Sequence, residues 1–266
     1  MNDAPVGIFD SGIGGLTVAR AIYERLPRES TIYFGDTARV PYGPKSPDTV
    51  RRYSLEILRW LLDQGVKAVV VACNTSTAHA LRALQESTEV PVIGVIKPGA
   101  RAAIAAGSGG PIGVIGTAGT IASNAYARAI AALAPDVRVV QRPCPLLVPL
   151  VEEGWFEHPA TELVAREYLA PLRDEGVRAL VLGCTHYPLL RPLLQRIMGP
   201  AVALIDSGQA TAEALETVLR DKALAAPGSA APRHRFVVSD DEARFRLVGS
   251  RFIGERLAGA EVVPLG

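Results

Sequence analysis

The strongest constraint on this fold is a stretch that the chain contains twice. Residues 64–75 return as residues 175–186 with a constant offset of 111 residues. Each copy has Gly-Val, a basic residue, an apolar run of strand length and a cysteine, followed by hydrogen-bonding side chains. An unbroken Val/Leu run between helical segments is typical of a strand buried on both faces of a parallel sheet. Cys73 and Cys184 are therefore predicted at the carboxyl ends of two such strands, where open α/β sheets bind ligands.

Two other strands recur in the same order. Residues 5–9 and the glycine-rich turn after them match residues 111–115 and the following turn at an offset of 106. Residues 91–96 match residues 200–205 at an offset of 109. Three strands in one order at similar offsets indicate an internal duplication, and two such halves could bring their cysteines together across a shared cleft.

The duplication predicts the domain organisation. The second copy runs from about residue 98 to residue 206. The residues after it are too few for a third α/β domain, and they contain a predicted helix over 210–225 and a predicted strand over 235–238. We therefore expect a first domain of residues 1–97 plus 207–266 and a second domain of residues 98–206.

Composition excludes several classes of function. Hydrophobic residues make up 48% of the 266 residues, which is enough for a large core. The 28 Lys and Arg balance 27 Asp and Glu, which argues against nucleic acid or an anionic membrane surface as the main partner. The start of the sequence lacks a basic region, and no apolar run approaches the roughly 20 residues of a membrane span, so we expect a soluble cytoplasmic protein. Three cysteines, an odd number, indicate free thiols.

The position of both cysteines before predicted helix starts suggests reactive thiols. The helix after Cys73 is predicted over residues 76–85, and Cys184 is also expected to precede a helix directly. The pKa of a thiol falls near a helix N-terminus or a positive partner. Each cysteine is therefore expected to be partly thiolate at neutral pH, with activity falling below about pH 6 to 7 if a thiolate is needed.

Four roles compete for the cysteine pair. A redox disulfide usually uses a close Cys-x-x-Cys, which the sequence lacks. A zinc site needs four ligands, and only His186 lies near the two thiols. A cysteine hydrolase needs one cysteine and a histidine base, which leaves the second cysteine unexplained. Acid–base catalysis from opposite faces of a stereocentre uses both cysteines in equivalent roles, and a duplicated fold supplies that arrangement.

Other polar residues at the strand ends fit a carbon acid that carries a carboxylate. Candidates for binding that carboxylate are the backbone N–H groups of residues 10–15 together with Asn74, Thr75 and Thr185. Asp10 would be better placed to hold an ammonium group or to orient Cys73. His186, two residues after the second cysteine, could tune that thiol.

At this point the motifs resemble those of the glutamate racemases. The resemblance rests on four segments: Gly-Ile-Phe-Asp10-Ser11-Gly-Ile-Gly-Gly, Gly35-Asp36-Thr37-Ala-Arg-Val-Pro-Tyr42-Gly43, Ala-Cys73-Asn74-Thr75 and Gly-Cys184-Thr185-His186-Tyr-Pro. It covers about residues 5–210. The resemblance implies two pseudosymmetric three-layer αβα domains with mainly parallel sheets, and an active site in the cleft between them.

The resemblance also implies a function and a set of site residues. It implies interconversion of L- and D-glutamate without metal, pyridoxal phosphate or nucleotide, a supply of D-glutamate for peptidoglycan, and a homodimer as an expected state. It makes Cys73 and Cys184 the two bases, and Asp36 and Glu152 weaker candidates for supporting the thiols. The residues implied to contact or position the substrate are Asp10, Ser11, Tyr42, Gly43, Asn74, Thr75, Thr117, Thr185 and His186.

The residues leave two alternatives open. One is an aspartate racemase or another amino-acid racemase of the same superfamily, since the choice of glutamate comes from the resemblance alone. The other is a two-domain protein that closes on a carboxylate without chemistry, in which the paired cysteines would be incidental.

Overall fold

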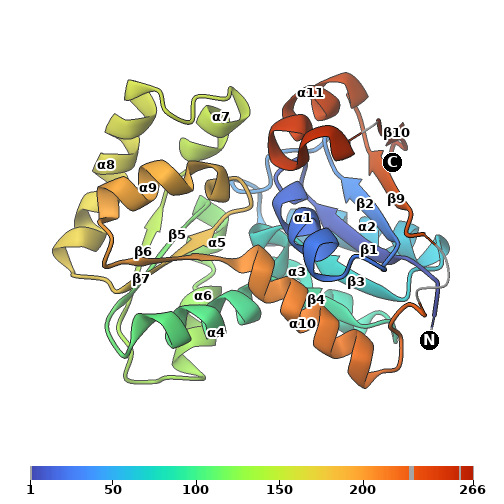
Figure 1. Cartoon of the computed structure of the whole chain (residues 1–266), viewed down its shortest axis with the longest axis horizontal. Helices are drawn as coiled ribbons and strands as arrows, with labels where there is room; N and C mark the ends of the chain where they lie inside the picture. The colour runs from blue at the N-terminus through green and yellow to red at the C-terminus, as the bar shows by residue number, and fades with distance from the viewer. Residues whose placement is uncertain (1, 228–230, 258, 266) are drawn as a thin grey trace.

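The computed structural model describes residues 2–227, 231–257 and 259–265. Its strands form two parallel sheets, each in its own α/β domain (Figure 1). The first sheet has the order β10-β9-β2-β1-β3-β4, with strands Glu261–Val262 (β10), His234–Val238 (β9), Thr31–Gly35 (β2), Val6–Asp10 (β1), Ala68–Val71 (β3) and Val92–Gly94 (β4). The second has the order β6-β5-β7-β8, with strands Val139–Pro143 (β6), Ile112–Gly116 (β5), Ala179–Gly183 (β7) and Ala203–Asp206 (β8). The predicted α/β fold with two parallel sheets is confirmed.

The duplication extends to four strands. The order β2-β1-β3-β4 of the first sheet equals the order β6-β5-β7-β8 of the second. The offset of 109 predicted for the fourth strand is wrong: Val92 pairs with Val69 and Leu204 pairs with Leu180, which puts equivalent positions 112 residues apart. Strand β6 was not predicted, because its residues are all half-buried and form no continuous apolar run.

Alternating side chains in the first sheet divide its core between two faces. Phe9 and Phe34 pack with the helices α2 (Pro47–Asp63) and α3 (Asn74–Glu86). Ile8 and Tyr33 point to the opposite face and join the core cluster of α1 (Leu16–Arg25), α10 (Ser207–Asp221) and α11 (Glu242–Ile253). Helix α11 and strand β10 were not predicted, although the predicted strand over 235–238 is confirmed as β9.

The second sheet is also covered on both faces. Helices α4 (Ile96–Gly107) and α6 (Ala125–Ala131) lie below it in Figure 1, and α8 (Pro159–Asp174) and α9 (Arg191–Met198) lie above it. Short elements complete the fold: α5 (Ala118–Ala122), α7 (Leu147–Glu152), η1 (Tyr187–Leu190) and η2 (Gly254–Arg256). Residue 96, predicted in a strand, begins α4 instead.

The two sheets draw their strands from different parts of the chain. Residues 1–97 and 207–266 supply the six-stranded sheet, and residues 98–206 supply the four-stranded one. The exact domain limits stay a prediction.

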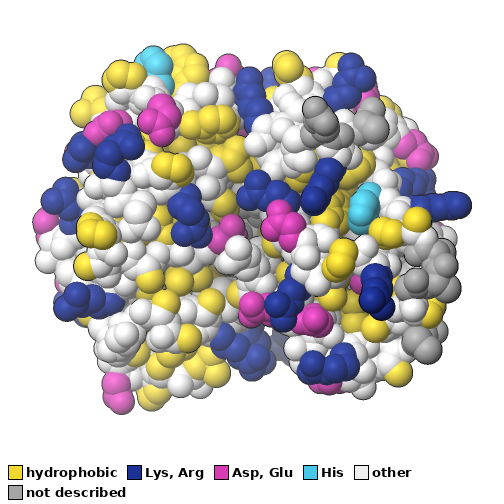
Figure 2. Space-filling model, viewed as in Figure 1, with side chains coloured by type: hydrophobic (Ala, Val, Ile, Leu, Met, Phe, Trp, Pro, Cys, Tyr) yellow, Lys and Arg dark blue, Asp and Glu magenta, His cyan; other side chains and the backbone are white. Residues whose placement is uncertain are grey.

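Basic and acidic side chains are interspersed on the face shown in Figure 2, and among the described residues no helix is long and apolar enough to cross a membrane.

Candidate active site

The carboxyl ends of the central strands of both sheets meet at a small cavity between the domains. Its volume is about 40 Å³. It is lined by Ser11, Val40, Pro41, Tyr42, Gly43, Cys73, Asn74, Thr75, Thr117, Val148, Cys184, Thr185 and His186. Every substrate-contacting candidate from the sequence is in this set except Asp10, which is fully buried beside it. Sequence reasoning missed Val40, Pro41 and Val148, because apolar loop and helix residues carry no chemical signal.

Cys73 is the N-cap of α3, as its place before a helix suggested. The helix begins at Asn74, two residues earlier than predicted, and the Ser76 backbone N–H donates to the Cys73 sulfur at 3.4 Å. Burial nevertheless raises the pKa of Cys73 to about 11, with a further increase from the negative charge of Asp10. The expectation of a partly ionised Cys73 is therefore wrong, since burial outweighs the helix N-terminus.

Cys184 follows β7 but does not precede an α-helix directly. The short helix η1 comes next, and α9 begins only at Arg191. Pro188 and Pro192 lack the backbone N–H groups that a continuous helix from Thr185 would need. The predicted helix start at Cys184 is therefore wrong, and the nearest polar partner of its sulfur is a side chain: His186 Nδ1 lies 3.8 Å from Sγ.

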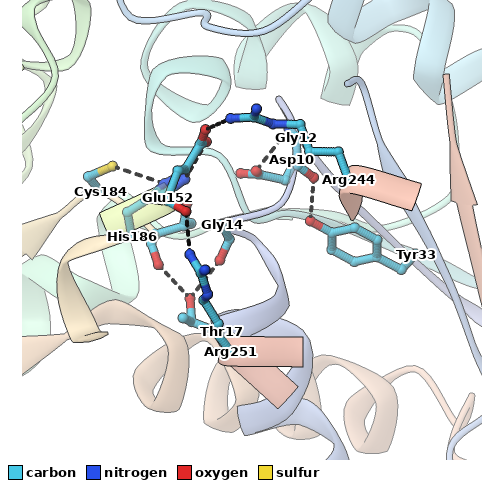
Figure 3. A network of polar contacts seen from close by, with 11 residues as sticks. Asp10, Gly12, Gly14, Thr17, Tyr33, Glu152, Cys184, His186, Arg244 and Arg251 are labelled. Carbon is cyan, nitrogen blue, oxygen red and sulfur yellow. Dashed lines mark hydrogen bonds and ion pairs between the residues drawn. The ribbon is translucent and has the colours of Figure 1, made fainter. Parts of the chain in front are cut away.

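His186 links Cys184 to a carboxylate (Figure 3). Its Nε2 lies 3.1 Å from Oε1 of Glu152, and the second oxygen, Oε2, accepts from Arg244 at 3.2 Å. Burial opposes charge on His186, but its contacts with Cys184 and Glu152 outweigh burial and raise its pKa to about 10. Burial likewise opposes charge on Glu152, but His186 and Arg244 lower its pKa. At neutral pH the pair is therefore an imidazolium and a carboxylate.

Asp10 lies at the end of β1 with no exposed surface. The Gly12 N–H donates to its Oδ2 at 3.0 Å, while its Oδ1 is buried without a hydrogen-bond partner in the described protein. Burial raises the pKa of Asp10, although His186 and the backbone N–H groups of the turn act in the opposite direction. A buried carboxylate with one free oxygen can accept a hydrogen bond from a cationic ligand or from a neighbouring thiol.

Polar groups from both domains also meet at the cavity wall. Thr75 Oγ1 lies 2.9 Å from Thr117 Oγ1 and 3.2 Å from Thr120 Oγ1. The Tyr126 hydroxyl donates to Asn74 Oδ1 at 2.7 Å and so fixes the amide. Asn74 Nδ2 is buried and has no partner within the described protein, which leaves an N–H donor available at the cavity wall.

Tyr42 and Asp36 hold a loop in place. The Tyr42 hydroxyl donates to the buried Asp36 carboxylate, and burial and that carboxylate raise the pKa of Tyr42. Asp36 also accepts from Arg39 at 2.8 Å and from Ser239 at 2.9 Å. The main-chain oxygen of Gly43 accepts from the Gly119 N–H at 2.9 Å, which joins this loop to the second domain. The described partners of Asp36 thus fix the loop and do not include either thiol.

The chain is similar to racemases of known sequence and structure. The family model described as Asp/Glu/Hydantoin racemase matches residues 14–215. The glutamate racemase of Syntrophus aciditrophicus is 52% identical over 261 residues, which cover 98% of this chain and 97% of that relative. Among solved structures, a glutamate racemase isoform from Bacillus anthracis superposes with a TM-score of 0.94 at 41% identity, covering 100% of this chain and 98% of that one. The chain belongs to the glutamate racemase family.

The Francisella tularensis glutamate racemase, solved in complex with D-glutamate, has a TM-score of 0.93 at 40% identity and covers 100% of this chain and 99% of that one. The family is one of isomerases, so the predicted enzyme class is confirmed.

In this member of the glutamate racemase family the two thiols occupy equivalent positions but have different neighbours. Thr75 follows Cys73 by two residues, as His186 follows Cys184. Within the described part of the chain, the Thr75 hydroxyl has hydrogen-bond partners that are neutral hydroxyls, whereas His186 belongs to an ionic chain with Glu152 and Arg244. The duplication therefore supplies the same scaffold twice with unequal electrostatics. Within the described ranges, no three His, Cys, Asp or Glu side chains form a group that could hold a metal ion.

Proposed function

We propose that this chain interconverts L- and D-glutamate without a cofactor, and that Cys73 and Cys184 act as acid and base on opposite faces of the α-carbon. The observation that carries the proposal is the presence of both thiols, at equivalent strand ends of duplicated domains, in one cavity lined by hydrogen-bonding groups. A racemase needs two groups that exchange roles, because the proton leaves one face and returns to the other.

The surroundings of the thiols suggest which one starts as the base. His186 Nδ1 faces the Cys184 sulfur at 3.8 Å, and contacts with Cys184 and Glu152 raise the pKa of His186, so we assign Cys184 as the thiol that starts as the base. Cys73, with its pKa raised to about 11, keeps its proton at neutral pH. In one direction the Cys184 thiolate takes the α-proton while Cys73 gives its own proton to the opposite face. The reverse reaction then starts with a Cys73 thiolate and a Cys184 thiol, so atoms and charge balance over both directions.

Removing an α-proton adds negative charge to the substrate carboxylate, and the site must stabilise that charge. Hydrogen-bond donors fixed before the reaction are the most effective way to do so. We assign this task to the free N–H of Asn74 and to the hydroxyls of Ser11, Thr75, Thr117 and Thr185. We assign Asp10 to binding the substrate ammonium group or to orienting Cys73. Asp10 lies close enough for its negative charge to act on the Cys73 thiol.

The wider role follows the family. We propose that the protein supplies D-glutamate for peptidoglycan in the cytoplasm, in support of cell-wall growth and cell shape, and that it works as a homodimer. The support is the similarity, over almost the whole chain, to curated glutamate racemases. Size-exclusion chromatography with light scattering would test the dimer directly: a monomer at micromolar concentration would contradict it.

A substrate panel tests the activity. Each enantiomer of glutamate and of aspartate is incubated with the purified protein, and the change in optical rotation is followed. We expect racemisation of both glutamate enantiomers and none of aspartate. Turnover of aspartate alone would favour an aspartate racemase, and binding without turnover by the unaltered protein would favour the non-catalytic alternative. Cys73→Ala and Cys184→Ala should each abolish racemisation while glutamate still binds.

A further inference from the structure

Helix α11 of the first domain contacts the ionic chain of the second domain (Figure 3). Arg244 Nη2 lies 3.2 Å from Oε2 of Glu152, the last residue of α7. Arg251 donates to the main-chain oxygen of the same glutamate. Phe252, the residue after Arg251, packs edge-on against the His186 ring at a centroid distance of 5.6 Å. Three residues of α11 therefore contact Glu152 and His186, the two residues that connect this helix to Cys184.

The Glu152 carboxylate is divided between two partners. Its Oε1 faces His186 and its Oε2 faces Arg244, so each oxygen has one cationic neighbour. The Glu152 and His186 side chains are 16% and 7% exposed, while Arg244 is 54% exposed. Arg244 is thus the solvent end of the chain, and its loss would leave Oε2 without its charged partner among the described residues.

We propose that Arg244 is a positioning residue for proton transfer at Cys184, acting through Glu152 and His186. This inference rests on the proposed function. The guanidinium holds the carboxylate in the orientation in which it faces His186, and a fixed, ionised carboxylate holds the ring toward the sulfur. Among the described residues, the hydrogen bonds and ion pairs of this chain end at Cys184 and not at Cys73, so Arg244 acts mainly on the Cys184 half of the reaction. Because Arg244 belongs to the first domain and Glu152 to the second, the support exists only when the domains are in contact.

The two enantiomers have equal free energies, so kcat/KM must stay equal in both directions in every variant. A defect at one cysteine therefore cannot appear as a directional difference in kcat/KM. It appears in the primary deuterium isotope effects on kcat/KM, measured with each enantiomer labelled at the α-carbon. If transfer at Cys184 becomes limiting, the isotope effect grows for the enantiomer whose α-proton Cys184 removes and shrinks for the other.

The experiment compares Arg244→Gln, Arg244→Lys and a control on the same helix, Arg246→Gln. Arg246 is exposed and forms no ion pair among the described residues. Three reference variants show the direction of the effect: Glu152→Gln and Cys184→Ser for the Cys184 half, and Cys73→Ser for the other half. Thermal melts establish that each variant is folded.

We expect Arg244→Gln to lower kcat/KM by about threefold to fivefold, a range set by its partial exposure. Relative to the unaltered protein, its isotope effect should grow for the same enantiomer as in Glu152→Gln and shrink for the other, whereas Cys73→Ser should show the opposite change. Arg244→Lys, which keeps the charge, should restore most of the activity and most of the original isotope effects. Arg246→Gln should match the unaltered protein.

Isotope effects in Arg244→Gln that equal those of the unaltered protein, or that change in the direction seen in Cys73→Ser, would overturn the inference while leaving the proposed function intact. A change as large in Arg246→Gln would also overturn it. Failure of the unaltered protein to racemise glutamate would overturn the proposed function itself and this inference with it.

Discussion

Gly14 offers a sharp test of how closely the domains must fit. It lies in the turn between β1 and α1, and a Cβ added there would be 2.4 Å from His186 Nδ1 and 2.4 Å from Thr185 Oγ1. Ordinary van der Waals contact begins near 3.4 Å, so a Gly14→Ala variant must move these side chains by roughly 1 Å. The backbone of Thr185 is held in place, because its main-chain oxygen accepts from Thr17 at 3.0 Å across the domain boundary.

The displaced Nδ1 atom of His186 is the one that faces the sulfur of Cys184, one of the two proposed bases. His186 Nδ1 lies 3.8 Å from Cys184 Sγ, and a shift of about 1 Å at a catalytic contact can cost about 100-fold in rate. Overpacking of this kind costs only about 1–3 kcal/mol of stability, which a folded protein of this size tolerates. Gly14→Ala should therefore lower kcat/KM for glutamate by about two orders of magnitude and leave the protein folded.

The assay is the change in circular dichroism as either glutamate enantiomer racemises, with a thermal melt for each protein. Gly107→Ala is the matched control, because its Cβ would meet no atom closer than 3.5 Å, and it should keep full activity. A folded Gly14→Ala variant with unchanged kcat/KM would refute the reasoning, since it would show that the contact between this turn and His186 is not needed.

Three further predictions concern stability and binding. The pKa of His186 is raised from 6.5 to about 10 in the folded protein. The stability that His186 contributes is therefore complete below pH 6.5 and is lost as the pH rises toward 10. Thermal melts should show this loss in the unaltered protein and not in His186→Asn. Tyr126→Phe leaves Asn74 Oδ1 buried without its donor, which should cost about 1–3 kcal/mol in urea unfolding and raise the KM for glutamate several-fold; an unchanged KM would contradict the role given to this amide. Lys67→Met strands the buried carboxylate of Glu29 and should cost about 3–5 kcal/mol in the same measurement, whereas a loss below about 1 kcal/mol would mean that this pair is not effectively buried.

The repeated sequence predicted the fold well because its continuous apolar runs indicate strands that are buried on both faces. The Val/Leu runs before Cys73 and Cys184 became the central strands β3 and β7, and those strands lead both thiols to one cavity. Strand β6 was not predicted because its residues are half-buried and show no hydrophobic periodicity that distinguishes a strand from a loop. The offset of the fourth strand was wrong because short apolar segments align equally well at several registers.

The electrostatics of the site could not be predicted from local sequence. A cysteine before a helix suggested an acidic thiol, but Cys73 is buried in a cluster with Tyr42 and Val50, which lie more than 20 residues earlier in the sequence. The partners of Glu152 are His186, which is distant in sequence, and Arg244 on a helix that the sequence did not predict. Such long-range pairs leave no signal in spacing or composition.

The most direct test of the two-base account is proton NMR of each glutamate enantiomer in deuterium oxide with the purified protein and no added cofactor. Two-base catalysis predicts loss of the α-proton signal from both starting materials, with deuterium in the enantiomer formed, because the second thiol delivers a solvent-derived hydrogen to the opposite face. Inversion that keeps the original α-proton in the product, or the absence of exchange from both enantiomers, would contradict it.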